Sequence, residues 1–209
     1  MALTPDGLMD ALKSVTDPNT GKEFAATRSL KNLQIAEGDV SFDLELGYPA
    51  KSQHAAIRKS LVAAAKAVPG VENVSVNIVT KVISHAVQRG VQLMPNVRNI
   101  IAVASGKGGV GKSTTAANLA LALAAEGASV GLLDADIYGP SQPMMMGLDG
   151  RPESIDGKNM EPKERHGVQV MSIGFLVDAD QATIWRGPLG PQAREQVLRQ
   201  THRKDLYHL

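Results

Sequence analysis

One loop constrains the fold of this chain more than any other feature. Residues 106–113 spell G-K-G-G-V-G-K-S, which matches the pattern G-x-x-x-x-G-K-[ST]. An apolar run, I-I-A-V-A-S at 100–105, precedes the loop, and an Ala/Leu-rich stretch at 112–125 follows it. A continuous apolar run is typical of a strand buried on both faces of a parallel sheet. The pattern therefore predicts a strand, a loop and a helix, with a second buried strand in S-V-G-L-L-D-A-D at 129–136.

The loop also has the chemistry of a nucleotide-phosphate site. Glycines let backbone N–H groups turn inward around phosphate oxygens, and the N-terminus of the following helix favours anions. Lys112 is placed to contact the β- and γ-phosphates of ATP, Ser113 to bind Mg²⁺ through its hydroxyl, and Thr114 to lie near the α-phosphate. The predicted nucleotide-binding residues are Gly106, Lys107, Gly108, Gly109, Val110, Gly111, Lys112, Ser113 and Thr114.

Two carboxylates follow the second apolar run. Asp134 and Asp136 stand at its carboxyl end, which is the edge where open parallel sheets bind ligands. Asp136 is a candidate to orient an attacking water, and Asp134 is a candidate to join the Mg²⁺ shell through water. The alternative is that both side chains only cap the loop. V-Q-V-M-S-I at 168–173 is predicted as a third strand of this half.

The first half of the chain has a different pattern. Thr4 and Pro5 suit the start of a helix, a hairpin is predicted from alternation around 33–46, a second helix over 57–68 and a third strand over 74–78. This order predicts a small α+β domain with its helices on one sheet face. The expected organisation is an α/β chain: an N-terminal domain at 1–90, a linker at 91–98, and the N-terminal part of a P-loop NTPase parallel-sheet domain at 99–209.

Composition excludes several classes of partner and site. The formal net charge is +1 without a dense basic run, which argues against nucleic acid. None of the 209 residues is cysteine, so the chain offers no thiolate metal ligand, and its five histidines lack metal-ligand spacing. The N-terminus lacks the features of a secretory signal, and no apolar run reaches the ~18 residues of a membrane span. A cytoplasmic protein without membrane contact is expected.

The second lysine of the loop, Lys107, carries a more specific signal. The sequence K-G-G-V-G-K-S resembles the deviant Walker A motif of the MinD/ParA/Mrp group of dimeric ATPases. In that group the early lysine contacts nucleotide phosphate across the dimer interface and acts like an arginine finger. The resemblance implies a homodimer with ATP at its interface and a catalytic role for Lys107, whose charge would offset charge developing in the transition state.

Three segments narrow the resemblance to the Mrp/ApbC-type iron–sulfur cluster carriers. They are G-K-G-G-V-G-K-S-T-T-A-A-N-L-A, L-L-D-A-D-I-Y-G-P-S-Q-P and W-R-G-P at 185–188. The first half of the chain resembles the small domain of metal–sulfur assembly factors. The resemblance implies an ATPase that binds a labile iron–sulfur cluster and delivers it to apo-proteins, alongside assembly factors. In that family Asp136 corresponds to the switch I carboxylate, a catalytic position, whereas Trp185 and Arg186 are assigned no catalytic role.

The chain also departs from that family. After W-R-G-P the family continues into a strand that ends in the Walker B aspartate and then reaches a C-P-x-C pair that binds the cluster. Neither segment is present here, so we expect a C-terminally truncated chain that contains no iron–sulfur ligand of its own. The same truncation predicts that the N-terminal domain folds well and that the NTPase half is marginal.

Two other functions fit part of the pattern. A MinD- or ParA-like positioning ATPase shares the two-lysine loop, but neither a membrane helix nor a basic DNA-binding patch is visible in the sequence. The third possibility is non-enzymatic, with the N-terminal domain acting as a docking module beside an inactive ATPase remnant. The run Met144–Met146 is interpreted as packing rather than as a flexible contact surface.

Overall fold

The computed structural model describes residues 3–84, 94, 96–136, 139–154, 156–176, 197–203 and 206–209. The chain divides into two compact units, Met1–Ile83 and Ser84–Leu209. This boundary lies close to the predicted limit of the N-terminal domain at residue 90. Half of the predicted linker, residues 91–93 and 95, lies outside the described residues, as does the W-R-G-P segment with Trp185 and Arg186, whereas Val97 and Arg98 form part of a strand.

The N-terminal unit has the predicted element order. Its elements are α1 (Pro5–Leu12), β1 (Leu30–Ala36), β2 (Asp39–Leu46), the 3₁₀ turn η1 (Lys51–Gln53), α2 (His54–Lys66) and β3 (Asn73–Thr80). Thr4 caps α1, because its hydroxyl accepts a hydrogen bond from the Gly7 amide at 3.2 Å. In the sheet, β2 lies between β1, to which it is antiparallel, and β3, to which it is parallel. The predicted hairpin is therefore confirmed.

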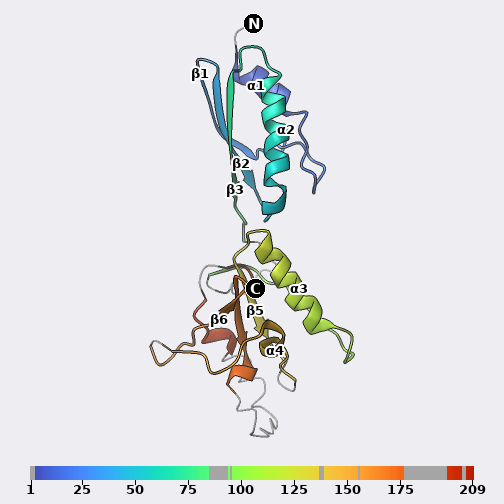
Figure 1. The fold of residues 1–209 in the computed structure, drawn as a ribbon, viewed down its shortest axis with the longest axis vertical. Helices are drawn as coiled ribbons and strands as arrows, with labels where there is room; N and C mark the ends of the chain where they lie inside the picture. The colour runs from blue at the N-terminus through green and yellow to red at the C-terminus, as the bar shows by residue number, and fades with distance from the viewer. Residues whose placement is uncertain are drawn as a thin grey trace. The chain divides into compact units, whose positions relative to one another are not determined.

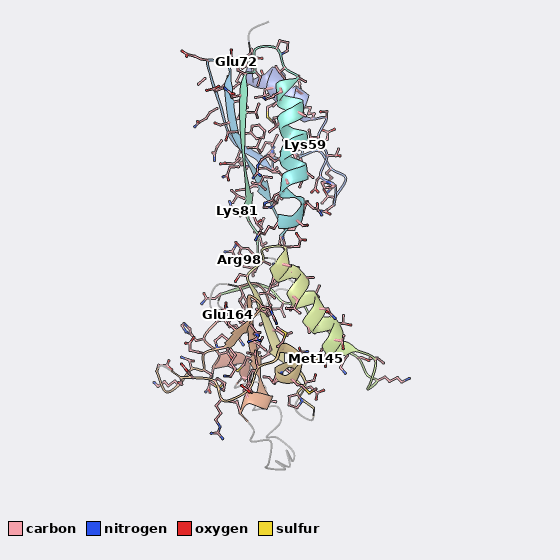
Figure 2. The ribbon with its side chains drawn as sticks, in the orientation of Figure 1. Lys59, Glu72, Lys81, Arg98, Met145 and Glu164 are labelled. Atoms are coloured by element: carbon pink, nitrogen blue, oxygen red, sulfur yellow. The ribbon has the colours of Figure 1, made fainter. Side chains whose placement is uncertain are left out.

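The core of this unit forms between the sheet and its two helices, which lie on the same side of it (Figure 1). Along β2 the buried side chains alternate with partly exposed ones, because successive residues of a strand point to opposite faces. Phe42 and Leu44 of β2 are buried with Leu8 of α1 and Leu61 of α2. Lys59 of α2 is exposed, on the side of the helix away from this core (Figure 2).

The second unit is built on a five-stranded mixed sheet. Its elements are β4 (Val97–Asn99), α3 (Lys112–Ala125), β5 (Val130–Asp134), α4 (Gln142–Met146), β6 (Lys163–Arg165), β7 (Val168–Ser172), η2 (Ile173–Phe175) and β8 (Leu206–His208). The strand order is β4-β8-β5-β7-β6, with β6 antiparallel to β7 and the other pairs parallel. The predicted helix at 112–125 and the predicted strands within 129–136 and 168–173 are confirmed.

The prediction of a buried strand at 100–105 is wrong. The strand lies just upstream, in β4, and Ile100 and Ile101 are 61% and 44% exposed. The neighbouring strand β8 explains the difference. It pairs with Val97 and Asn99, and the last ladder contact joins the Ile101 amide to the Leu209 carbonyl at 2.8 Å. Among the described residues no strand pairs with the segment beyond this contact, and an extended segment needs such a partner to form a sheet.

The helices of this unit pack through small and sulfur-containing side chains. Ala117 and Ala120 of α3 are buried against the sheet, so that the helix lies close to β5. The run Met144–Met146 fits packing at one residue only, because Met146 is buried. Met144 is 83% exposed, and Met145 lies at the surface of α4 (Figure 2), as a contact surface would require.

Within the described part of the chain, no helix combines the length and the apolar character needed to cross a membrane.

Candidate nucleotide-phosphate site

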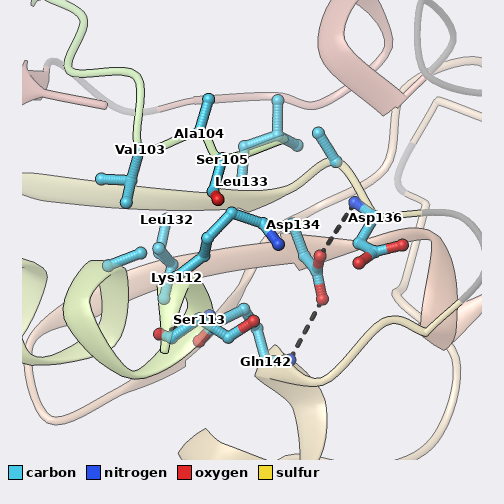
Figure 3. A pocket seen from close by; sticks show the side chains of 12 residues that line it. Val103, Ala104, Ser105, Lys112, Ser113, Leu132, Leu133, Asp134, Asp136 and Gln142 are labelled. Atoms are coloured by element: carbon cyan, nitrogen blue, oxygen red, sulfur yellow. Dashed lines mark hydrogen bonds between the residues drawn. The ribbon is translucent and has the colours of Figure 1, made fainter. Parts of the chain in front are cut away.

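A pocket of about 520 Å³ opens where the N-terminus of α3 meets the carboxyl end of β5. It brings together four of the residues predicted from sequence, namely Lys112, Ser113, Asp134 and Asp136. Figure 3 shows the Lys112 side chain extending toward Asp134. The other residues lining it are Val103, Ala104, Ser105, Ala116, Leu132, Leu133, Ala135 and Gln142. A cation, a hydroxyl and two carboxylates thus share one cavity.

The glycine loop leads into α3 through a left-handed turn. Gly109 has φ +72° and Gly111 has φ +87°, values that side chains with a Cβ rarely adopt, and α3 begins immediately after Gly111. The Thr115 amide donates to the Gly111 carbonyl at 2.9 Å and so starts the helical ladder. Gly106 and Gly108 have no such φ, and a Cβ added to either would meet no described heavy atom within 4 Å. Their lack of a side chain is therefore not explained by packing and suits the approach of a ligand to the backbone.

Asp134 is held rigidly at the floor of the pocket. It is only 8% exposed and accepts three hydrogen bonds: from the Asp136 amide at 3.1 Å, the Gln142 amide at 3.0 Å and the Ser172 hydroxyl at 3.3 Å. Asp136 is exposed, and its carboxylate accepts from the Gly139 amide at 3.2 Å. Both carboxylates thus cap the loop after β5, as the alternative interpretation expected. Their predicted roles toward magnesium and water stay predictions.

The outer part of the loop lies away from the cavity lining. Lys107 is exposed, and its amide donates to the Ser105 hydroxyl at 3.1 Å. Thr114 is also exposed, and its carbonyl accepts from the Asn118 side chain at 2.9 Å. The stretch Gly106–Gly111, including Lys107 and Val110, does not line the pocket. The cavity of this single chain therefore contains the second lysine of the loop, Lys112, and not the first.

Gln142 is a lining residue that sequence reasoning did not single out. It is 3% exposed, and its Nε2 donates to the Ser113 carbonyl at 3.0 Å while its backbone amide donates to Asp134. The only sequence signal for it is its place in the segment G-P-S-Q-P, eight positions after Asp134. A glutamine has no ligand preference distinctive enough to be recognised from such a position alone.

The donors present fit a magnesium nucleotide better than a metal ion held by protein alone. Among the residues described, no three His, Cys, Asp or Glu side chains gather in the way a metal centre requires. Magnesium in nucleotide sites is usually held by one or two protein oxygens together with phosphate oxygens and water. The Ser113 hydroxyl and the Asp134 carboxylate, both at this pocket, are oxygen ligands of that kind.

Models of two protein families match separate parts of the chain. Residues 96–209 match the ParA family, described as NUBPL iron-transfer P-loop NTPase, and residues 6–78 match a family described as iron–sulfur cluster assembly protein. The two matches follow the order of the two structural units. They confirm the fold class predicted from the sequence, a small α+β domain followed by a P-loop NTPase domain.

Two iron–sulfur cluster carrier proteins agree with the family models. The chain is 44% identical over 191 residues to an iron–sulfur cluster carrier protein of Synechocystis, covering 90% of this chain and 54% of that protein. It is 60% identical over 114 residues to the carrier of Escherichia coli, covering 54% of this chain and 31% of the relative. A solved nucleotide-binding protein of Archaeoglobus fulgidus in complex with ADP is 39% identical, with a TM-score of 0.45, over 55% of this chain and 43% of that one.

The chain spans about half the length of the Synechocystis relative. The family match of the NTPase segment nevertheless covers more than half of the present chain, and the resemblance to Mrp/ApbC-type carriers is confirmed. The chain therefore belongs to the ParA family of iron-transfer P-loop NTPases, the group of the iron–sulfur cluster carrier proteins.

Proposed function

We propose that this chain binds ATP with Mg²⁺ in the pocket between α3 and β5, as the nucleotide-binding part of an iron–sulfur cluster carrier. The observation that carries the proposal is the convergence of Lys112, Ser113 and Asp134 on one cavity next to a left-handed glycine loop. A helix N-terminus, the backbone amides of a glycine loop and an ammonium group form a site for phosphate, because all three place positive charge near the anion.

Each residue of the pocket has a distinct role in this proposal. Lys112 contacts the β- and γ-phosphates, and Ser113 supplies a hydroxyl oxygen to the metal. Asp134 already accepts three hydrogen bonds from the protein, so it acts on the metal through water rather than directly. Asp136 is exposed at the mouth and positions the attacking water. Magnesium, when bound with the nucleotide, neutralises charge on the phosphate oxygens.

Lys107 is assigned to a second copy of the chain. It is exposed and lies outside the cavity lining of its own protomer, a placement compatible with a lysine that acts across an interface. In the proposed homodimer each Lys107 reaches the nucleotide of the partner, where its charge stabilises the transition state of hydrolysis.

The cluster is the cargo of the proposed carrier, and apo iron–sulfur proteins receive it. None of the 209 residues is a cysteine, so we assign no cluster ligand to this chain. Residues 6–78, which match an iron–sulfur assembly family and carry their own core, are assigned to docking of assembly partners. The activity proposed for the present chain itself is thus nucleotide binding and hydrolysis.

Calorimetric titration of Mg-ATP into the intact chain tests the proposal. Lys112→Ala is the site variant, and Lys59→Ala, at an exposed lysine of α2, is the matched control. We expect saturable binding by the unmodified chain and by Lys59→Ala, and loss of measurable binding in Lys112→Ala, because the phosphates lose their ammonium partner. A folded chain that binds no Mg-ATP, or a Lys112→Ala variant that binds as tightly as the control, overturns the proposal.

A further inference from the structure

Gln142 joins the two sides of the candidate nucleotide pocket. Its backbone amide donates to Asp134 Oδ2 at 3.0 Å, and its side-chain Nε2 donates to the Ser113 carbonyl at 3.0 Å. One residue thus connects the first turn of α3 with the carboxyl end of β5. Figure 3 shows its side chain lying beside Ser113. Any displacement of Gln142 would therefore act on two of the residues assigned to the metal.

The side-chain oxygen of Gln142, Oε1, has no hydrogen-bond partner among the described residues. Oε1 is shielded from solvent, and no donor among the described residues reaches it. The orientation of the amide is fixed, because the Ser113 carbonyl only accepts and must face the NH₂ group. An unpaired buried acceptor costs on the order of 1–3 kcal/mol. Unsatisfied groups of this kind in a pocket lining are where a ligand donor is expected to bind.

The chemistry of Oε1 restricts what such a donor can be. A carbonyl oxygen repels phosphate oxygens, so the nucleotide phosphates are not its partner. Magnesium keeps several waters when it binds a nucleotide, and each of these waters donates strongly because the metal polarises it. Both neighbours of Gln142 in the pocket, Ser113 and Asp134, are the residues to which the metal shell is assigned. A metal-bound water therefore combines the required chemistry with the required place.

We propose, on the basis of the nucleotide binding proposed above, that Gln142 is a positioning residue that makes nucleotide affinity depend on magnesium. Nε2 holds the start of α3 through Ser113, and Oε1 accepts a hydrogen bond from a water of the bound Mg²⁺. Gln142 lines the cavity while its Oε1 is shielded from solvent, so the proposal includes a shift of the side chain that turns Oε1 toward the metal site. When nucleotide binds without the metal, only the bond from Nε2 to Ser113 remains.

The test compares dissociation constants for ADP in Mg²⁺ and in EDTA, and their ratio is the readout. Gln142→Met keeps the length of the side chain and removes both polar atoms. Gln142→Glu keeps an acceptor and removes the donor to Ser113. Ser141→Ala is the matched control, because Ser141 also has a buried unpaired oxygen on this loop but does not line the pocket.

We expect Gln142→Met to lower the benefit of Mg²⁺ on the order of tenfold, in addition to a smaller loss of affinity in EDTA that follows from the lost bond to Ser113. Gln142→Glu should preserve or increase the benefit, and Ser141→Ala should match the unmodified chain. Equal weakening of Gln142→Met in both buffers would reveal a merely structural residue and overturn the inference, as would a collapse of the ratio in Gln142→Glu. No binding by the unmodified chain in either buffer would instead overturn the proposed function, and this inference with it.

Discussion

The Tyr48 hydroxyl donates to the Asp17 carboxylate at 2.5 Å, across 31 positions of sequence. Asp17 is buried and also accepts from the Asn19 amide and the Thr20 hydroxyl, each at 2.9 Å. These contacts attach the long loop between α1 and β1 to the segment that follows β2. Within the loop, an isolated antiparallel bridge joins Thr16 to Glu23, and the Asp17 carboxylate adds the side-chain contact to Tyr48.

Removing the Tyr48 hydroxyl should loosen that loop. In Tyr48→Phe the buried carboxylate loses a donor while its other partners remain, which predicts a local destabilisation of about 1–3 kcal/mol. Hydrogen exchange of the peptide spanning residues 13–29, measured in the intact chain, reports the change. Tyr207→Phe, in the other unit, is the control and should leave that peptide protected. Unchanged exchange in Tyr48→Phe would show that the contact does not hold the loop.

The same pair predicts how the N-terminal unit responds to acid. Burial acts to raise the pKa of Asp17, but hydrogen bonds from Tyr48, Asn19 and Thr20 outweigh it and lower the pKa below the ordinary value. The unfolded chain therefore takes up this proton more readily than the folded one. The stability that Asp17 contributes is fully present above its unfolded pKa of about 3.9 and is lost as pH falls through the folded pKa.

Tyr48 affects the stability of the same unit at high pH. Burial, with the bond to Asp17, raises its pKa to about 12. The stability that Tyr48 contributes is therefore present below the ordinary pKa of about 10 and is lost as pH rises through about 12.

Urea unfolding at several pH values tests the prediction for Asp17. Following the methyl NMR signals of Leu44 and Leu61 reports the stability of this unit alone. We expect Asp17→Asn to be less stable at neutral pH and to show a shallower loss below pH ~4. Parallel acid limbs in the two proteins would contradict the assignment.

Gly131 leaves little room for a side chain beside Leu206 and Leu209. A Cβ added at this position of β5 would lie 2.7 Å from Leu206 Cδ1 and 2.8 Å from Leu209 Cδ1. Leu206 is fully buried, so it has little room to move. Gly131→Ala should destabilise the docking of β8 by about 1–3 kcal/mol through overpacking.

Hydrogen exchange of the amides that β8 and its continuation use tests this prediction. The Leu206 amide donates to Asn96, and the Leu209 amide to Asn99. Both should exchange faster in Gly131→Ala. Gly47→Ala is the control, since a Cβ there meets nothing within 4 Å and should change neither amide. Protection equal to that of the unmodified chain would show that the two leucine side chains move aside without cost.

The sequence predicted those elements that have a pattern in their own residues. Alternation along 40–46 identified β2, because one face of that sheet is covered by helices and the other is not. The glycine loop identified the start of α3, because its spacing is fixed by phosphate chemistry. The apolar run at 100–105 misled, because a strand also needs a neighbour along its whole length, and β8 ends before that run. A three-residue strand such as β8 has no periodic signal of its own.

Within the site, sequence identified the residues whose chemistry is tied to a motif. Lys112, Ser113 and Asp134 line one pocket because the motif and the end of β5 meet there, and their binding roles stay predictions. Gln142 was not found, since its role follows from two hydrogen bonds and an unpaired oxygen that only the folded chain brings together. Hydrogen bonds between residues on separate elements cannot be predicted from the spacing of those residues along the chain.

The position of Lys107 leads to the most discriminating prediction for hydrolysis. Because Lys107 lies outside the lining of its own pocket, Lys107→Ala should bind Mg-ATP with nearly unchanged affinity. Turnover should fall on the order of a hundredfold or more, as expected when a cation that stabilises the transition state is removed. Calorimetry and steady-state phosphate release measure the two quantities separately. A similar loss of binding and turnover would place Lys107 among the ground-state phosphate contacts instead.

Mixing two inactive variants tells whether Lys107 acts on its own nucleotide or on that of the partner. Lys107→Ala retains a binding pocket, whereas Lys112→Ala retains Lys107 but lacks the phosphate contact. In a mixed dimer, the intact pocket of the first variant faces the intact Lys107 of the second, so one site per dimer is complete. Hydrolysis should therefore reappear on mixing and saturate as the Lys112→Ala partner is added in excess. If Lys107 served its own chain, no combination of the two variants would hydrolyse ATP, because neither protomer contains both lysines.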